Sequence, residues 1–516
     1  MSDSLYYVFM RKRFISALFV FTSLAGFAQV SVKQKPNIVI ITVDDMGYFD
    51  PSCMHRGLAS YQTPNIDRIA QNGMIVSDYY AQACSTAGRA ALLTGQYPIR
   101  TGLTSVGQPG SKVGLKTEDP TLAVLLKNEG YDTALFGKWH LGDRNEYLPT
   151  NHGFDVFYGM MYHLNMMEMP EQAEFPKDPN YPGRPRNMIY STSTDKYSNE
   201  MDKRWGEVGR QTIKDMGPLT SKRMETIDEE FLEYSEKWIE EKAKDDQPFF
   251  LWFNPTRMHQ TTHVSEKWRG VSGQSVYADG VAQLDWIVGK LLDKLEELKL
   301  MENTIILFTA DNGVNLSHWP DGGTAGFRGE KGTTWDGGFR VPMLVQWKGH
   351  IKESSYTGEF MTSEDWLPTL MAAVGNTNIK EELKKGVKIR DREYHVHIDG
   401  YNQLDMLTKG GKSQRHEFFY FAENNLNAVR VDQWKGHIAT KDSWLESATK
   451  LDGGLLVNIK LDPFERSVDT PGHFLWMKEK TYITPMFVPY INEFKKSMKE
   501  FPPRQKGSGV GAQRIQ

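Results

Sequence analysis

The sequence predicts an α/β fold: a large, mostly parallel mixed sheet sandwiched by helices, followed by a smaller antiparallel sheet with one helix. From Pro36 to about Gly375, short apolar runs rich in β-branched residues alternate with amphipathic helical patterns. This alternation is typical of a parallel sheet covered on both faces. After about residue 380, strands with alternating polarity follow one another across turns. The 516 residues also exceed the roughly 250–300 at which a single core stops growing, so two packed units are expected.

Each element of the first unit is predicted from its own pattern, because helical spacing indicates helices and short continuous apolar runs indicate buried strands. In chain order the predictions are strand 37–43, helix 121–130 with strand 131–137, helix 228–244 with strand 249–253, and helix 281–298 with strand 304–310. The segment from Met166 to Asn187 holds five prolines and predicts a long surface loop. Loops of that length are uncommon unless they serve a site.

The second unit is predicted from three stretches of alternating polarity and one amphipathic stretch. "HEFFYFA", "NAVRVDQWKGHIA" and "GGLLVNIKLDP" predict its strands, and "YINEFKKSMKEF" predicts its helix. We therefore expect a main domain over residues 34–380 and a C-terminal subdomain over 381–505. A tail over 506–516 is expected to lie along the surface or to fray.

Residues 1–28 predict an export signal with a short upstream extension. A basic cluster follows Met10, an apolar stretch runs from Phe14 to Phe27, and small residues precede a cleavage site after Ala28. The stretch is short for a membrane span of ~20 residues, and no later segment is apolar enough to cross a bilayer. We expect a periplasmic or secreted protein without a stable membrane span.

Composition narrows the partners. The net charge of −4 gives no reason to expect nucleic acid. The two cysteines, Cys53 and Cys84, make no disulfide framework and fit no zinc site, so they are expected to be buried and unpaired.

Polar side chains follow four of the predicted strands. In chain order they are Asp44 and Asp45, Lys138 and His140, His259, and Asp311 with Asn312. Because open α/β sheets bind ligands beyond the carboxyl ends of their strands, these groups are expected to share one site. The acids and the amide offer only oxygen ligands, which suit Ca²⁺ or Mg²⁺ rather than zinc.

A cationic set accompanies these oxygen ligands. It comprises Arg89, Lys138 and Lys331, with the two imidazoles beside them. Together with a divalent ion, these groups predict an electropositive pocket for a compact dianion or a tetrahedral oxyanion ester. Two candidate nucleophiles, Cys84 and Ser85, precede the helical run of "ACSTAGRAALLTG", where a helix N-terminus would favour an anion.

Long ordered motifs resemble the type I sulfatases of the alkaline phosphatase superfamily. The resemblance runs from "PNIVIITVDDMGYFD" to "VNIKLDPFER" and includes "STAGRAALLTGQYPIRTG", "GYDTALFGKWHLG", "TADNG" and "GEKGTTWDGGFRVP". "NPTRMHQTTH", "HIDGYN" and "FPPRQK" are closer to an arylsulfatase branch. The resemblance implies an alkaline phosphatase-like fold. One departure is Trp335-Asp336, where many relatives have an aromatic residue followed by Glu; it is expected to support its loop without entering the chemistry.

The resemblance also assigns the nucleophile. The family signature places a Cys or Ser four residues before an Arg, and counting back from Arg89 gives Ser85, while Cys84 is out of register. By resemblance, Ser85 is oxidised to formylglycine by a radical, serine-type maturation enzyme. The hydrated aldehyde would attack sulfur with one hydroxyl and release sulfate when the second collapses.

Further roles follow from the same resemblance. One Ca²⁺ would be held by Asp44, Asp45, Asp311 and Asn312, with position 85 also a ligand. Arg89 would orient the diol, Lys138 would anchor it or the sulfate, and His140 would be the base for the collapse. His259 and Lys331 would bind sulfate and protonate the leaving oxygen.

The expected substrate is an aryl sulfate or a sulfated saccharide, with His163, Asn165 and Glu168 as candidate contacts to sugar hydroxyls. Two alternatives remain at this point. One is a phosphatase or phosphodiesterase of the same superfamily that uses unmodified Ser85, although an amide at position 312 favours a single hard ion. The other is a catalytically silent glycan-binding relative, although no motif residue is lost.

Overall fold

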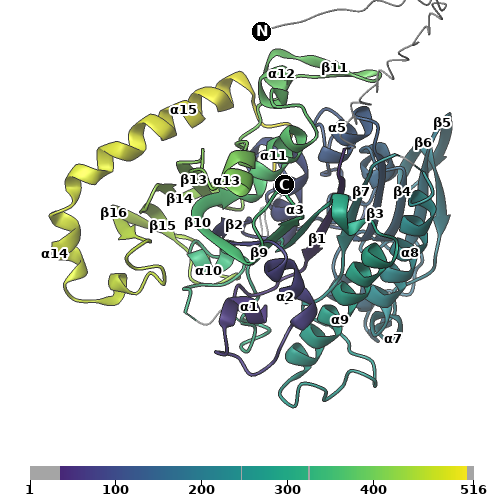
Figure 1. Ribbon diagram of the computed structural model, residues 1–516, viewed down its shortest axis with the longest axis horizontal. Coiled ribbons are helices and arrows are strands. Elements are labelled where there is room, and N and C mark those ends of the chain that lie inside the picture. The colour runs from purple at the N-terminus through teal and green to yellow at the C-terminus, as the bar shows by residue number, and fades with distance from the viewer. Residues whose placement is uncertain (1–34, 246, 324–325, 508–516) are drawn as a thin grey trace, which may run out of the picture. The chain divides into compact units, whose positions relative to one another are not determined.

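The computed structural model describes residues 35–245, 247–323 and 326–507, so the predicted export signal and residues 508–516 lie outside the described part. Its centre is a ten-stranded mixed sheet (Figure 1). In sheet order the strands are β10 (Ser355–Thr362), β2 (Met74–Tyr80), β9 (Met343–Trp347), β8 (Thr304–Ala310), β1 (Asn37–Val43), β7 (Phe249–Asn254), β3 (Asp132–Lys138), β4 (Val156–Met160), β5 (Ile189–Asp202) and β6 (Gly206–Asp215).

The middle of this sheet is parallel. β8, β1, β7, β3 and β4 are consecutive parallel neighbours, whereas β9, β5 and β6 pair antiparallel with the strands beside them. Every residue of β1 and β8 is buried, which explains their uninterrupted apolar sequences. The predicted mostly parallel mixed sheet is confirmed.

Helices cover the sheet in two groups, one of α2, α8 and α9 and one of α3, α5 and α11, and Figure 1 shows the sheet between them. The bounds of these six helices are α2 (Pro64–Gln71), α3 (Ser85–Thr94), α5 (Leu122–Asn128), α8 (Ile227–Lys242), α9 (Val276–Glu297) and α11 (Trp366–Ala373). The other helices of this part are α1 (Ser52–His55), α4 (Pro98–Thr101), α6 (Leu164–Glu168), α7 (Ser221–Met224), α10 (Asp336–Phe339), α12 (Ile379–Lys385) and α13 (Leu404–Lys409). None of the described helices is long and apolar enough to span a membrane.

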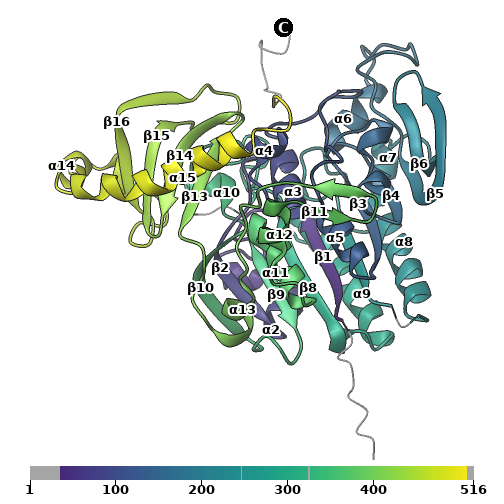
Figure 2. The same cartoon turned by 90° about the horizontal axis from the view of Figure 1, so that it is seen from above.

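The C-terminal part forms the predicted antiparallel sheet with a helix against it (Figure 2). Its elements are β13 (Glu417–Ala422), β14 (Asn425–Val431), β15 (Trp434–Thr440), β16 (Thr449–Asn458), α14 (His473–Lys478) and α15 (Phe487–Glu500). Phe419 of β13 stacks on Phe494 of α15 with ring centroids 4.4 Å apart. These aromatic contacts belong to a second core, separate from the main one under the large sheet.

Several features depart from the sequence predictions, among them β2, β4, β9 and β10, for which no strand was predicted. The first residues of the predicted loop 166–187 belong to α6. The side chain of His163 caps the N-terminus of that helix by accepting a hydrogen bond from the backbone N–H of Met166. The β5–β6 hairpin was not predicted, since its outer half is exposed and lacks alternating polarity. A short antiparallel pair, β11 (Val387–Ile389) and β12 (Arg392–Tyr394), also lies outside the predictions.

Candidate functional site

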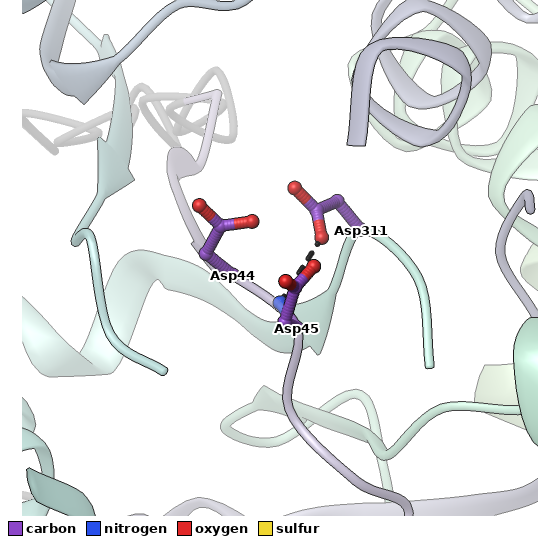
Figure 3. A group of neighbouring side chains, drawn as sticks. All are labelled: Asp44, Asp45 and Asp311. Carbon is purple, nitrogen blue, oxygen red and sulfur yellow. Dashed lines mark hydrogen bonds between the residues drawn. The ribbon is translucent and has the colours of Figure 1, made fainter. Parts of the chain in front are cut away.

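Three carboxylates meet at the carboxyl ends of β1 and β8. Asp44 and Asp45 follow β1, Asp311 follows β8, and the register that pairs Val43 with Ala310 brings them side by side. Each offers one oxygen within 4.8 Å of the other two, and all three residues are buried. The backbone N–H of Asp45 lies 3.4 Å from Asp311 Oδ1, the dashed contact in Figure 3. The structure therefore brings together the acids that the sequence predicted to share a site.

Asn312 and Ser85 add two more oxygen atoms to the three carboxylates, and we call this group of five side chains the oxygen cluster. The amide of Asn312 donates to Asp45 Oδ1 at 2.7 Å. Ser85 begins α3, and its Oγ lies 3.0 Å from both Asp44 Oδ1 and Asn312 Oδ1. Cys84 is the N-cap of α3, and its thiol points to the carbonyl of Thr104 instead, 3.7 Å away. Geometry therefore separates the two adjacent candidate nucleophiles.

Three buried cations face this cluster, and each bonds one carboxylate. Arg89 Nε donates to Asp311 Oδ2 at 2.8 Å, Lys138 Nζ donates to Asp44, and Lys331 Nζ donates to Asp45 Oδ1 at 2.5 Å. Lys331 Nζ also lies 3.5 Å from the hydroxyl of Ser85. The three cations that the sequence predicted to lie beside the oxygen ligands therefore share one buried volume with the three carboxylates.

The charges shift the pKa of the buried groups in opposite directions. Burial would raise the pKa of Asp44, but the charges of Lys138, Arg89 and Lys331 outweigh it and hold that pKa well below the ordinary value. Burial, together with the charge of Asp44, raises the pKa of Asp311 to about 6.

Burial and neighbouring charges also compete in setting the pKa values of the two lysines. Burial lowers the pKa of Lys138, and the neighbouring charge of Arg89 adds to that effect. Burial would also lower the pKa of Lys331, but the carboxylates of Asp45 and Asp44 outweigh it and raise that pKa. Lys331 therefore holds its protons firmly beside the cluster.

Three histidines lie together beside the oxygen cluster. The rings of His163 and His259 are stacked, with centroids 5.1 Å apart and planes 13° apart. The ring of His140 meets that of His163 edge-on at 5.7 Å. Burial is the largest cause that lowers the pKa of each well below its ordinary value, with nearby positive charges adding to it, so all three are neutral at pH 7. Within the described part of the chain, neither ring nitrogen of His140 has a hydrogen-bond partner.

A cavity of about 420 Å³ opens onto these groups, and we call it the site cavity. His140, His163, Asn165, His259 and Lys331 line it. The third predicted sugar contact, Glu168, does not, because its carboxylate lies 3.2 Å from His263 Nε2 instead.

The sequence reasoning missed other residues that line the site cavity. They are Val106, Gln108, Gln260, Asn315, Ser317, His318, Trp444 and Leu445. Gln260 directly follows His259, and three more follow the Asp311-Asn312 pair closely, so proximity to a motif could have found them. Trp444 and Leu445 carried no such signal, since they lie in the loop between β15 and β16 of the C-terminal sheet.

The oxygen cluster fits a hard divalent cation. The donors that converge are three carboxylates, an amide oxygen and a hydroxyl, which are ligands of Ca²⁺ or Mg²⁺. Asp45 Oδ2 is buried without a hydrogen-bond partner in the described residues. A cation among these oxygens would relieve the repulsion that raises the pKa of Asp311.

Asp336, the unusual residue of the "WDGG" segment, lies away from this chemistry. Its carboxylate accepts hydrogen bonds from Tyr80 at 2.5 Å, Tyr420 at 3.1 Å and Lys435 at 2.8 Å. These contacts support the loop, as the sequence predicted, and also join it to β13 and β15 of the C-terminal sheet.

Comparison with known proteins agrees with this geometry. Human arylsulfatase A is 32% identical over 431 residues, which are 81% of this chain and 78% of that protein. Dog N-acetylgalactosamine-6-sulfatase is 30% identical and covers 84% of this chain and 78% of its own. The crystal structure of the PsFucS1 sulfatase from a Pseudoalteromonas species superposes with a TM-score of 0.77 at 26% identity, covering 91% of this chain and 92% of that one. Since a sequence model of the Sulfatase family also matches residues 36–376, the chain belongs to the sulfatase family and is a sulfuric ester hydrolase.

Proposed function

We propose that this chain hydrolyses a sulfate ester on a carbohydrate. The reaction uses one bound Ca²⁺ and a formylglycine that is formed from Ser85. The observation that carries the proposal is the hydroxyl of Ser85, buried 3.0 Å from two of the oxygen ligands and 3.5 Å from Lys331. A relative that covers most of the chain is named for a sulfated amino sugar, which supports a carbohydrate substrate.

The proposed ion is held by Asp44, Asp45, Asp311 and Asn312, with the side chain at position 85 beside them. Bound there, Ca²⁺ supplies Lewis-acid polarisation of oxygen ligands and sulfate oxygens. The formylglycine hydrate supplies a geminal diol, which allows sulfate to leave without water attacking sulfur.

The residues around position 85 have distinct roles in this proposal. The hydrogen bond to Asp311 fixes the side chain of Arg89. Position 85 lies one helical turn before Arg89 in α3, so Arg89 orients the side chain at position 85. Lys138 supplies a positive charge that anchors the same side chain or the sulfate. His140 is neutral and its ring nitrogens have no hydrogen-bond partner among the described residues, so it can take a proton from the oxygen at position 85.

His259 and Lys331 stand on the substrate side. His259 Nδ1 lies 2.9 Å from the carbonyl of Gln260, so Nδ1 carries the proton and Nε2 is left to receive one. The negative charge of a bound sulfate ester would raise the His259 pKa and favour the charged ring, which can donate to the leaving oxygen. Lys331 holds its protons and binds the sulfate.

Contacts to the sugar are proposed for two of the three predicted residues. His163 Nδ1 accepts the N–H of Met166 at 3.3 Å, so its neutral ring carries the proton on Nε2 and can donate to a ligand oxygen in the site cavity. Asn165 offers an amide at the same wall. Glu168 would have to leave His263 to reach a ligand.

The proposal includes maturation and export. A radical, serine-type maturation enzyme converts Ser85, and cleavage after Ala28 releases a periplasmic or secreted protein. Sequencing the mature N-terminus from the native source should give Gln29. A native protein that retains residues 10–28 would contradict the export proposal.

Activity on chromogenic esters tests the proposed reaction. Protein co-produced with a serine-type maturation enzyme should hydrolyse 4-nitrophenyl sulfate, and 4-nitrophenyl phosphate far more slowly. Ser85→Ala should abolish the activity while leaving the protein folded. Preference for the phosphate ester, or full sulfatase activity in Ser85→Ala, would sink the proposal.

A further inference from the structure

The site cavity carries little charge beyond the sulfate-binding end. Among the described residues that line it there is no carboxylate and no arginine, and Lys331 is its one lysine. That lysine already bonds Asp45 at 2.5 Å and is assigned to the sulfate. A second anionic group on the substrate would therefore meet no second lysine and no arginine among the described lining residues.

Neutral hydrogen-bonding groups take the place of charges. Gln108, Asn165, Gln260 and Asn315 present amides to the site cavity. The amide nitrogen of Asn315 donates to Gln260 Oε1 at 2.9 Å, while its own Oδ1 is buried without a partner in the described residues. An unpaired buried acceptor of this kind favours a ligand that brings hydroxyl donors.

Another part of the lining of the site cavity comes from the loop between β15 and β16. Trp444 is half-buried, and its ring packs on Gly332, where an added Cβ would lie 2.2 Å from Trp444 Cε3. Lys331 Nζ lies 5.3 Å from the centre of the same ring. Leu445 projects beside it with 83% of its surface exposed, although it lines the site cavity. An exposed leucine next to a tryptophan makes an apolar platform at the cavity rim.

We propose that the site cavity selects a monosulfated neutral sugar whose C–H face packs on the platform of Trp444 and Leu445. The inference rests on the proposed sulfatase reaction and deepens it, because it defines the substrate class. Amides bind the hydroxyls, the platform covers the apolar face, and Lys331 binds the sulfate. A carboxylate or second sulfate on the same ring would lose its water without gaining a cation.

Trp444 could instead act only as a support for Lys331. The two roles predict different kinetics, because a platform residue contributes to substrate binding whereas a support for Lys331 contributes to the chemical step. Leu445 separates them further, since it lines the site cavity and no contact joins it to Lys331 among those the structure describes.

A substrate panel tests the selectivity. Matured protein is assayed on 4-nitrophenyl sulfate, on every regioisomer of a monosulfated neutral hexose and its N-acetylated analogue, and on sulfated uronic acids and disulfated hexoses. We expect at least one neutral monosulfated sugar to exceed every doubly anionic sugar by about 100-fold in kcat/KM, the scale on which a pocket discriminates against a substrate that adds one polar group. Equal or faster cleavage of the doubly anionic sugars overturns the inference. The inference is also overturned if the protein cleaves the aryl sulfate but none of the neutral sugars. In that case the proposed sulfatase reaction still stands.

Substitutions on the platform test its role. Trp444→Ala should raise KM for the preferred sugar about tenfold with little change in kcat, and Trp444→Phe should restore most of the loss. Leu445→Ala should raise KM for the sugar more than for 4-nitrophenyl sulfate. Leu461→Ala is the matched control, because Leu461 is also 83% exposed in the C-terminal part but lies outside the site cavity. A fall in kcat with unchanged KM in Trp444→Ala, or equal effects of the two leucine substitutions, overturns the platform.

Discussion

Residues 84 and 85 are neighbours in the chain, yet their side chains have different surroundings. The backbone at Cys84 is extended and turns into α3 at Ser85, so successive side chains leave in different directions. Ser85 faces the oxygen cluster, whereas Cys84 is buried beside Thr104 and burial raises the pKa of its thiol. A thiol of raised pKa is a poor nucleophile, so electrostatics and geometry favour the same residue.

The first prediction concerns maturation of this pair. In active protein, mass spectrometry of the peptide over residues 81–89 should show an aldehyde at position 85, lighter than serine by about two hydrogens and reactive with hydrazides. Cys84→Ala should keep the activity and lose at most ~1–2 kcal/mol of stability, the cost of a small truncation in a core. Protein from a host without the radical enzyme should keep Ser85 and be inactive although folded. An aldehyde at position 84 would refute the register argument.

The second prediction concerns the metal. Adding Ca²⁺ to chelator-treated protein should raise the free energy of unfolding, by ~2.7 kcal/mol at a hundredfold excess over Kd. Asp45→Asn should remove most of that gain, because Asp45 Oδ2 is buried and accepts no hydrogen bond within the described residues. Asp293→Asn, at an exposed ion pair, is the control and should keep it. Metal analysis should give one calcium per chain; two zinc ions per chain would rule the site out.

At the scale of elements, α3 owes its position to a glycine. A Cβ on Gly88 would lie 1.9 Å from the carbonyl oxygen of Asp311, so the helix backbone rests directly on the end of β8. This close approach places Ser85 and Arg89, which flank Gly88, against the acidic cluster. The packing of one helix on one strand end therefore sets the geometry of the site.

The third prediction follows from that contact. Gly88→Ala should push α3 away from Asp311, cost ~1–3 kcal/mol of stability as overpacking does, and lower kcat/KM more than tenfold, because a small misplacement of reacting groups is costly. Gly453→Ala in β16 is the control, since nothing lies within 4 Å of its added Cβ. Denaturant unfolding and aryl sulfate kinetics measure both effects. Wild-type kinetics in Gly88→Ala would contradict this account.

How well the sequence predicts an element depends on whether a local sequence pattern or tertiary packing determines that element. Strands 37–43 and 304–310 are predicted to the residue because full burial makes them continuous apolar runs, and the acids after them are therefore placed correctly. The β5–β6 hairpin escaped prediction because its exposed half needs no apolar face. Trp444 reaches the site cavity only through the packing of one sheet beside another, which no local pattern encodes.

At the scale of the molecule, buried ion pairs join the C-terminal sheet to the large one. Asp78 of β2 receives two hydrogen bonds from Arg430 of β14, at 3.0 and 2.7 Å, and both residues are buried. Lys435 of β15 bonds Asp336 and Glu465 together, at 2.8 and 2.9 Å. These pairs fix the position of the sheet from which the platform loop emerges, so the specificity of the site depends on contacts far from the sulfate.

The last prediction concerns this junction and its dependence on pH. Arg430→Met should cost ~3–5 kcal/mol at pH 7, because it leaves the Asp78 carboxylate buried with fewer cations. Burial would raise the pKa of Asp78, but the charges of Arg430, Arg340 and Lys460 outweigh it and hold the pKa below its ordinary value. The stabilisation is therefore present above about pH 4 and is lost as the pH falls below that range, so the difference between wild type and variant should shrink there. Lys348→Met, at an exposed pair with Glu302, should cost less than ~1 kcal/mol. Urea unfolding between pH 7 and acid measures both variants, and a difference that stays constant below pH 4 would show that Asp78 does not stabilise the junction through its charge.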